Sequence, residues 1–183
     1  MPRGLVSGAT KMKPCCAALC CAGPAFDAAQ GFGYDKPAHQ PCRHLAPSHA
    51  CTIHAQRRAL GFGACEVFDC HGAGQRATAL FAGASWQDGP AVAVRMFEAY
   101  ARLRVLHELL VLLAAAGRRA PDAAVARALA ALAQRVEAAC AGPLEAFERR
   151  GDPQPLRQEV LQALRQWGAR LFPAPAPADP LTP

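Results

Sequence analysis

Residues 15–21 read CCAALCC, and this cysteine-rich stretch decides how we expect the first half of the chain to fold. The 183-residue sequence holds nine cysteines, eight of which lie before residue 71. Eight thiols crowded into one third of the chain exceed what an apolar core needs, although free cysteine is often buried. We therefore predict that thiolates from several loops meet at a shared metal centre in this region.

The role expected of these cysteines depends on the cellular compartment of the protein. The N-terminal MPRGLVSGATKMKPCC has no run of seven or more apolar residues, so no secretory signal is expected. The most apolar later stretch, Leu109 to Ala116, falls short of the ~20 residues that cross a bilayer. We expect a cytoplasmic protein that does not bind membranes. A reducing cytosol favours metal ligation or redox chemistry over a disulfide framework.

The formal net charge of +6 is spread along the sequence. Residues 1–75 contain seven basic and four acidic side chains, and residues 76–183 contain thirteen and ten. Arginines lie among glutamates along the expected helices, so no basic stripe of the kind that binds phosphates stands out. Nucleic acid is therefore not an expected partner. Four thiolates on one zinc ion would also add two negative charges.

The composition and the helical periodicity of the sequence change near residue 89. Residues 1–89 are rich in Cys, Gly, Pro and His and have almost no helical periodicity, so we expect an irregular, metal-stapled module there. Bound structural zinc contributes roughly 10–16 kcal/mol to the folding of small finger peptides. Residues 90–172 are expected to form a small bundle of three or four helices, and the proline-rich residues 173–183 a disordered tail. The predicted fold class is therefore mainly α.

The expected helices follow from apolar residues that recur every three or four positions. One helix runs from Pro90 to a cap at Gly117, a second from Asp122 to Gly142, a short one from Leu144 to Gly151, and a last one opens at Asp152 and Pro153. The stripes expected to be buried are Met96, Tyr100, Leu103, Leu106, Leu110 and Leu113 on the first helix, Val125, Leu129, Leu132, Val136 and Cys140 on the second, and Leu156, Val160, Leu164, Trp167 and Leu171 on the last.

The spacing of the cysteines leaves several ligand sets open. Cys16 and Cys20 are separated by three residues, a spacing that lets two thiolates face one ion, and Cys42 and Cys51 are the first choice to complete a tetrahedral zinc site or an iron–sulfur cluster. Cys65 and Cys70 form another pair, which allows a second ion. Cys21 directly follows Cys20, and two adjacent thiolates reach one ion only through a strained small ring, so one of these two thiols is expected either beside the metal shell or as a reactive thiol. His54 is an alternative ligand.

The order of the cysteine motifs resembles that of a known family. The segment from Cys16 to Cys21, then YDKPAHQPCRHL at 34–45, CTIHAQRRALGFGAC at 51–65 and FDCHGAGQ at 68–75, resembles the zinc- or iron-chelating domain found at the N-terminus of certain bacterial pentapeptide-repeat proteins. The resemblance covers roughly residues 13–90. It implies metal chelation by the cysteines that match the family's positions: Cys16, Cys20, Cys21, Cys42, Cys51, Cys65 and Cys70.

The sequence departs from that family at several positions. Lys13 stands where related sequences begin with a cysteine, and Cys15 could replace the missing thiol. Ala18 replaces a glycine, and His71 replaces an aromatic residue after Cys70. Residues 91–183 contain no pentapeptide run, so the stacked β-helix of such proteins is not expected here.

Two classes of function stay open at this point. The first is a metal-binding protein, zinc or iron–sulfur, whose site has a structural or interaction role with a protein partner or in a homo-oligomer. The alternative is an iron–sulfur or thiol redox enzyme, or a component of a protein-modifying oxidoreductase. A closed shell of four thiolates has no open position for Lewis-acid catalysis, whereas surplus thiols beside it would suit redox work. No catalytic constellation of paired carboxylates or of Ser, His and Asp is evident in the sequence.

Overall fold

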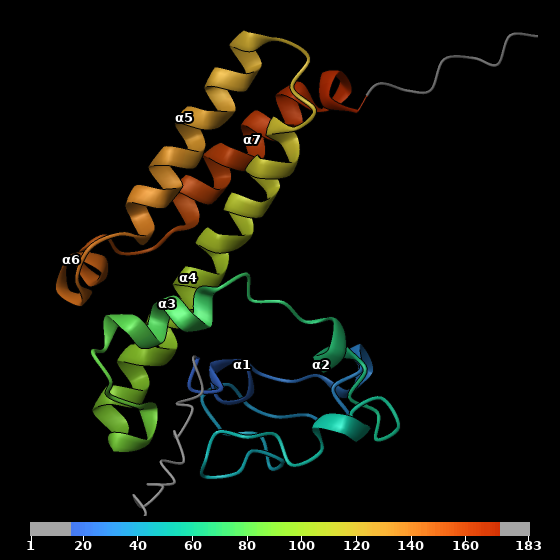
Figure 1. The fold of residues 1–183 in the computed structure, drawn as a ribbon, viewed down its shortest axis with the longest axis vertical. Helices are drawn as coiled ribbons and strands as arrows, with labels where there is room; N and C mark the ends of the chain where they lie inside the picture. Colours follow the sequence, from blue (N-terminus) through green and yellow to red (C-terminus); the bar gives the residue numbers. More distant parts are fainter. Residues whose placement is uncertain (1–15, 173–183) are drawn as a thin grey trace, which may run out of the picture. The chain divides into compact units, whose positions relative to one another are not determined.

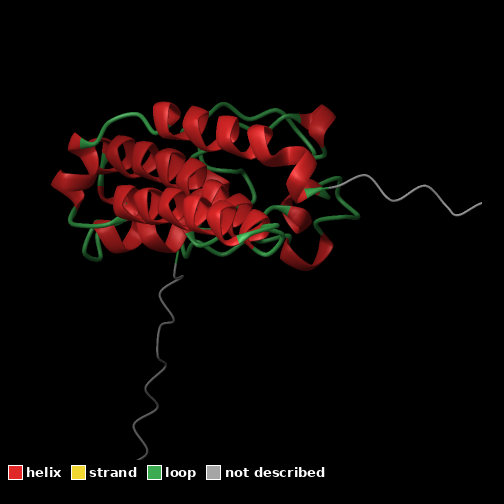
Figure 2. Cartoon of the chain, turned by 90° about the horizontal axis from the view of Figure 1, so that it is seen from above, coloured by secondary structure: helices red, strands yellow, loops and turns green. Residues whose placement is uncertain are grey.

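A computed structural model describes residues 16–172 of the chain, and this part is mainly helical, with no β-strand (Figures 1 and 2). Cys15 and the proline-rich tail lie outside the described residues. The α-helices are α1 (Leu19–Ala22), α2 (Ala64–Val67), α3 (Ala73–Leu80), α4 (Pro90–Gly117), α5 (Ala123–Cys140), α6 (Leu144–Arg149) and α7 (Gln154–Leu171). Three short 3-10 helices are η1 (Ala28–Gln30), η2 (His54–Gln56) and η3 (Trp86–Asp88).

The described residues form two compact units. Unit 1 contains residues 16–68 and 74–97, and unit 2 contains residues 69–73 and 98–172. Helix α4 therefore begins in unit 1 and continues in unit 2. No helix among residues 16–172 combines the length and the apolar character that crossing a bilayer requires.

The long helices begin and end close to where the sequence predicts. Helix α4 runs from Pro90 to Gly117, and α5 is capped by Asp122, whose carboxylate accepts hydrogen bonds from the N–H groups of Ala124 and Val125 at 2.9 Å. The predicted stripe of α5 is buried throughout, Cys140 included. On α4 the predicted buried stripe was wrong at one position. It contained Leu110, which is only partly buried, and omitted Leu109, which is 2% exposed.

Helices α5 and α7 of unit 2 lie side by side, and α7 runs antiparallel to α5 (Figure 1). Helix α7 begins at Gln154, one residue after the expected start, and its first N–H group donates to the Asp152 carboxylate at 3.0 Å. Val160 and Leu171 are buried in its stripe. The remaining residues of that stripe are partly buried: Leu156, Leu164 and Trp167.

Unit 1 consists largely of loops, yet it has an apolar interior that the sequence analysis did not predict. Leu19, Phe26 and Phe62 are buried in it. The sequence GFG occurs at residues 31–33 and again at 61–63, and the two triplets are in contact. Gly33 lies so close to the Phe62 ring that an added Cβ atom would be 2.6 Å from it. Triplets thirty residues apart thus pack against each other, with a glycine providing space for an aromatic ring. The segment is therefore organised in part by aromatic packing and not by thiols alone.

Residues 72–76, GAGQR, combine the end of a turn with the first residues of a helix. His71 and Gly72 adopt left-handed backbone angles, with φ of 51° and 85°. Helix α3 then begins at Ala73 and includes the remaining residues of the segment. The turn thus occupies only the two residues before the helix, since a residue with positive φ cannot continue a right-handed helix.

Candidate cysteine site

The first part of the site is the tight turn that leads from Cys16 into α1. Ala17 and Ala18 both adopt left-handed backbone angles, with φ of 46° and 51°. Such angles favour glycine, which is the residue that the resemblance expects at position 18. The turn brings the Sγ atoms of Cys20 and Cys21 to 3.8 Å from each other, within hydrogen-bonding distance for sulfur. Two adjacent thiols therefore point to the same side of the chain.

Cys42 lies next to this turn and is buried, with 8% of its surface exposed. Its backbone N–H donates to the carbonyl of Cys21 at 3.0 Å, which ties the two segments together. The N–H of His44 donates to the Cys42 sulfur at 3.4 Å. Burial raises the pKa of Tyr34, and a hydrogen bond with Cys42 acts in the same direction. The backbone N–H of His44 and the hydroxyl of Tyr34 thus both lie at the Cys42 sulfur.

Cys51 and Cys65 come from two further segments. Cys51 pairs with Leu45 in an isolated antiparallel bridge that closes the loop between them. Cys65 lies in α2, whose first N–H, that of Ala64, donates to the carbonyl of Gly31 at 3.0 Å. Both cysteine side chains are partly buried.

The charges that shift the pKa of each thiol indicate which cysteines lie near one another. The pKa of Cys21 is raised, first because its thiol donates a hydrogen bond to Cys20, and also because of burial and the charges of Cys20, Cys42 and Cys51. Burial raises the pKa of Cys65 too, and the charges of Cys20, Cys42 and Cys51 add to this. Five cysteines of unit 1 are thus near enough for their charges to act on one another, and we name them the thiol cluster: Cys20, Cys21, Cys42, Cys51 and Cys65.

Cys20 is the most acidic thiol of this cluster. Its pKa is lowered to about 7, chiefly because the Cys21 thiol donates a hydrogen bond to its sulfur. Burial opposes the shift, while backbone N–H groups and the charge of Arg57 support it. At neutral pH Cys20 therefore has a larger thiolate fraction than an ordinary cysteine.

Two cations act on the thiol cluster, and no motif or spacing in the sequence marks either of them. Lys36 is 4% exposed, and its ammonium donates to the backbone carbonyls of Pro37 at 3.1 Å and Gln40 at 2.7 Å, as well as to that of Pro24. Burial lowers the pKa of Lys36, and the charges of Cys42 and Cys21 oppose this shift. A lone lysine in a loop usually extends into solvent, so only the fold reveals its burial.

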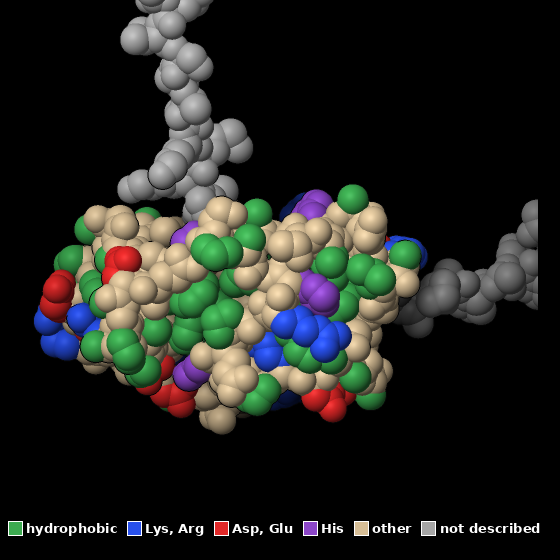
Figure 3. All heavy atoms as spheres, turned by 90° about the horizontal axis from the view of Figure 1, so that it is seen from below, with side chains coloured by type: hydrophobic (Ala, Val, Ile, Leu, Met, Phe, Trp, Pro, Cys, Tyr) green, Lys and Arg blue, Asp and Glu red, His purple; other side chains and the backbone are tan. Residues whose placement is uncertain are grey.

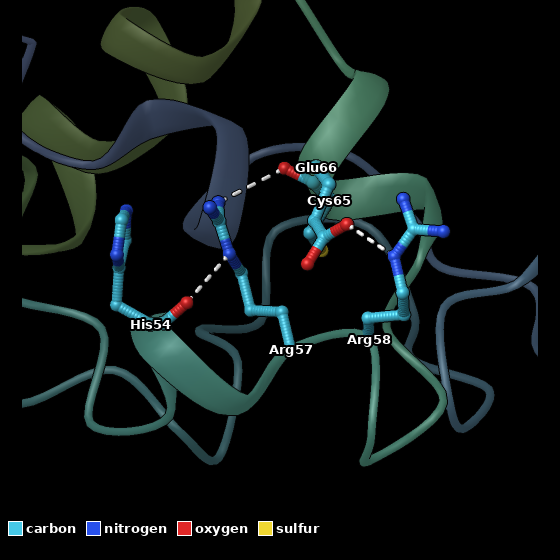
Figure 4. Close-up of polar contacts among 5 residues, drawn as sticks. All are labelled: His54, Arg57, Arg58, Cys65 and Glu66. Carbon is cyan, nitrogen blue, oxygen red and sulfur yellow. Dashed lines mark hydrogen bonds and ion pairs between the residues drawn. The ribbon is translucent and has the colours of Figure 1, made fainter.

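The second cation is Arg57, which Figure 4 shows between His54 and Cys65. Its Nε donates to the carbonyl of His54 at 3.0 Å, and a terminal nitrogen donates to the carbonyl of Cys65 at 3.1 Å. Its neighbour Arg58 instead pairs with Glu66 at 2.8 Å. The His54 side chain is exposed and lies on the far side of Arg57 from Cys65 in Figure 4. The alternative that His54 is a ligand thus gains no support from this geometry.

Not all of the seven predicted ligands belong to the thiol cluster. Five form the thiol cluster. Cys16 precedes them in the turn before α1, and its carbonyl accepts the N–H of Leu19 at 3.1 Å. Cys70 belongs to unit 2, where its carbonyl accepts the N–H of Ala73 at 2.9 Å. Within residues 16–172 no three His, Cys, Asp or Glu side chains are arranged so that they could already hold a metal ion.

The surface face drawn in Figure 3 carries charges of both signs. Lys and Arg side chains form small groups there, and hydrophobic, uncharged and histidine side chains lie among them. Acidic side chains are also present on this face. The face is thus of mixed character.

Comparison with known proteins identifies one relative among the curated proteins. The uncharacterized protein YybG of Bacillus subtilis (strain 168) is 34% identical to this chain over 96 residues, which make up 52% of this chain and 34% of YybG. The chain therefore spans about a third of the length of that relative. No protein-family model matches the chain. No solved structure matches it either.

Proposed function

We propose that the thiol cluster of unit 1 binds a thiophilic metal, zinc or an iron–sulfur cluster, and that the metal stabilises a surface for a protein partner or a second copy of the chain. The observation that carries this proposal is the convergence of cysteines from four separate segments. Cys21 and Cys65, which are 44 positions apart, both have Cys20, Cys42 and Cys51 as electrostatic neighbours. Such chemistry suits a reducing compartment such as the cytosol.

The donor chemistry of the cluster fits these metals. Soft thiolate ligands select zinc and iron–sulfur clusters. Two sulfurs on one tetrahedral zinc, each about 2.3 Å from the ion, are about 3.8 Å apart. The Sγ atoms of Cys20 and Cys21 have this separation. Since no three donors among the described residues already form a metal-binding group, the other thiols have to rotate or shift toward that pair when an ion binds.

Metal analysis of the full chain, purified without oxygen, tests the proposal. We expect about one zinc ion or one cluster per chain, lost in Cys42→Ser and retained in the control Cys140→Ala, since Cys140 lies on α5 outside the cluster. Colourless protein with zinc would identify a zinc site, and brown protein with labile sulfide an iron–sulfur site. Protein that holds neither metal, and that takes up neither on reconstitution, would contradict the proposal.

A second candidate function, thiol redox chemistry, is favoured by the acidity of Cys20. A thiolate attacks a disulfide, forms a mixed disulfide and releases the second sulfur of the substrate as a thiolate. The pKa of Cys20, about 7, is near the optimum for such an attack at neutral pH. A metal-free chain that reduces a disulfide substrate, and that loses this activity in Cys20→Ser, would support this candidate over the first.

A further inference from the structure

Cys20 and Cys21 are two adjacent thiols of α1 whose sulfurs lie close together. Their Sγ atoms are 3.8 Å apart, and both residues are partly exposed. Two other cysteines, Cys42 and Cys140, are buried. A small thiol-reactive ligand can therefore reach both sulfurs of the pair and contact them at the same time.

Hydrogen bonds hold the backbone on both sides of this pair. The carbonyl of Ala17 accepts the indole N–H of Trp86 at 2.8 Å, and the carbonyl of Cys21 accepts the N–H of Cys42 at 3.0 Å. The N–H of Cys21 also donates to the carbonyl of Ala18 at 2.9 Å, which closes the turn before the pair. A ligand that binds both sulfurs therefore has little backbone to order, and such preorganisation favours binding.

The two sulfurs are placed for bridging by one atom and not for bonding to each other. A disulfide usually joins residues whose Cα atoms are about 4.4–6.8 Å apart, whereas consecutive Cα atoms are only about 3.8 Å apart. A disulfide between Cys20 and Cys21 would therefore be strained, and its sulfurs would have to close from 3.8 Å to about 2.0 Å. An atom that forms one bond to each sulfur instead leaves the two sulfurs close to their present separation.

From this geometry we infer that Cys20 and Cys21 form a chelating site for a trivalent arsenical. Trivalent arsenic is soft and pyramidal, forms three bonds, and prefers thiolate sulfur. An organoarsenic oxide, R–As=O, condenses with the two thiols: two As–S bonds form, the two S–H bonds and the As=O bond break, and one water molecule leaves, with no change in oxidation state. The group R is the third substituent on arsenic, so two protein donors are enough. The described residues agree with this, because no three donors among them are arranged to hold a metal ion.

Titration of the reduced, metal-free full chain with phenylarsine oxide tests this inference, in the presence of excess 2-mercaptoethanol as a competing monothiol. We expect one tightly bound arsenical per chain. Chelation by two linked groups typically strengthens binding by about 10²- to 10⁴-fold, and Cys20→Ser and Cys21→Ser should each lose about this factor. Cys140→Ser is the matched control, because Cys140 lies on α5, and it should bind like the wild type. Circular dichroism verifies that each variant is folded.

A second measurement needs no variant. One equivalent of phenylarsine oxide should protect Cys20 and Cys21 of the wild type from iodoacetamide and leave the alkylation of Cys51 and Cys65 unchanged, as read by peptide mass spectrometry. Protection of another pair of cysteines, or equal affinity of the wild type and Cys21→Ser for the arsenical, would overturn the inference.

The inference goes beyond the proposed metal site, which needs thiols from several segments, whereas the arsenical needs only two adjacent residues. Cys42→Ser separates the two proposals, because this variant should lose zinc and keep the arsenical. Loss of the arsenical in Cys42→Ser would overturn the inference. A wild-type chain that binds no zinc but does bind the arsenical through Cys20 and Cys21 would contradict the proposed function and support the inference.

Discussion

Lys36 and Phe26 are joined both through their backbones and through their side chains. The N–H of each residue donates to the carbonyl of the other, at 2.9 and 3.1 Å, and the Lys36 ammonium lies 4.6 Å from the centre of the Phe26 ring. The pair closes the loop that leads from Cys21 to Cys42. Residues other than cysteines thus help to hold together the segment between Cys21 and Cys42.

Lys36→Met should therefore destabilise unit 1. The substitution keeps an apolar side chain of similar length, but it leaves the carbonyls of Pro24, Pro37 and Gln40 without their donor, at a cost of about 1–3 kcal/mol. Urea unfolding followed by Trp86 fluorescence measures this in a Trp167→Phe background, because Trp86 belongs to unit 1. An unchanged unfolding midpoint would show that the ammonium contributes nothing to this loop.

Gly33→Ala should destabilise the same unit by a steric route. Gly33 has φ of 69°, and an added Cβ would overlap the Phe62 ring. The left-handed angle and the overpacking together predict a loss of about 2–5 kcal/mol. Gly63→Ala is the control, because its Cβ would meet no atom within 4 Å and its φ is ordinary for an L residue. Equal stability of the two variants in the Trp86 assay would refute the packing of the GFG triplets.

The helical part of the fold could be predicted from the sequence, since its determinants are local. The cap at Asp122, the end of α4 at Gly117 and the stripe from Val125 to Cys140 are each set by residues within one or two turns. The choice of Leu109 over Leu110 could not be predicted, because it depends on the angle at which α4 meets its neighbours. Adjacent leucines satisfy the same helical period almost equally well.

The candidate site was predictable in its residue types but not in its arrangement. Cysteine crowding indicated convergence, yet sequence order gave no means of separating Cys70, which belongs to unit 2, from Cys65 in unit 1. The two cations were missed because Lys36 and Arg57 acquire their neighbours only through long-range packing. The same is true of Phe62 and Gly33. Short motifs identify chemistry, whereas contacts between distant loops have to be taken from coordinates.

Cys20 should be the first thiol to react in the metal-free chain. Its pKa is lowered to about 7, so its thiolate fraction, and with it the alkylation rate, should rise through that pH. The pKa of Cys65 is raised by burial, so Cys65 should react more slowly than an ordinary cysteine at the same pH. Pulsed iodoacetamide labelling at several pH values, read by peptide mass spectrometry, measures both. A slower reaction of Cys20 than of Cys65 at pH 7 would contradict the hydrogen bond from Cys21.

Asp122 joins two helices of unit 2. Its carboxylate caps α5, and it also pairs with Arg170 on α7. The N–H of Val125 is the main cause that lowers the pKa of Asp122 below its ordinary value, and Arg170 and Ala124 act in the same direction. A carboxyl whose pKa is lowered in the folded state contributes stability above its unfolded pKa, about 4, and loses it as the pH falls through the lower folded value.

Two substitutions of Asp122 should separate the cap from the charge. Asp122→Asn keeps a capping oxygen and loses the pair with Arg170, whereas Asp122→Ala loses both, so stability at pH 7 should fall in the order wild type, Asn, Ala. As the pH falls below about 4 and through the lower folded pKa, the wild type should progressively lose its advantage over Asp122→Asn, since the carboxyl becomes protonated. Urea unfolding followed by Trp167 fluorescence in a Trp86→Phe background measures this. Glu137→Gln is the control, because Glu137 is exposed on the same helix. A difference in stability between the wild type and Asp122→Asn that persists at pH 2 would exclude the carboxylate as its cause.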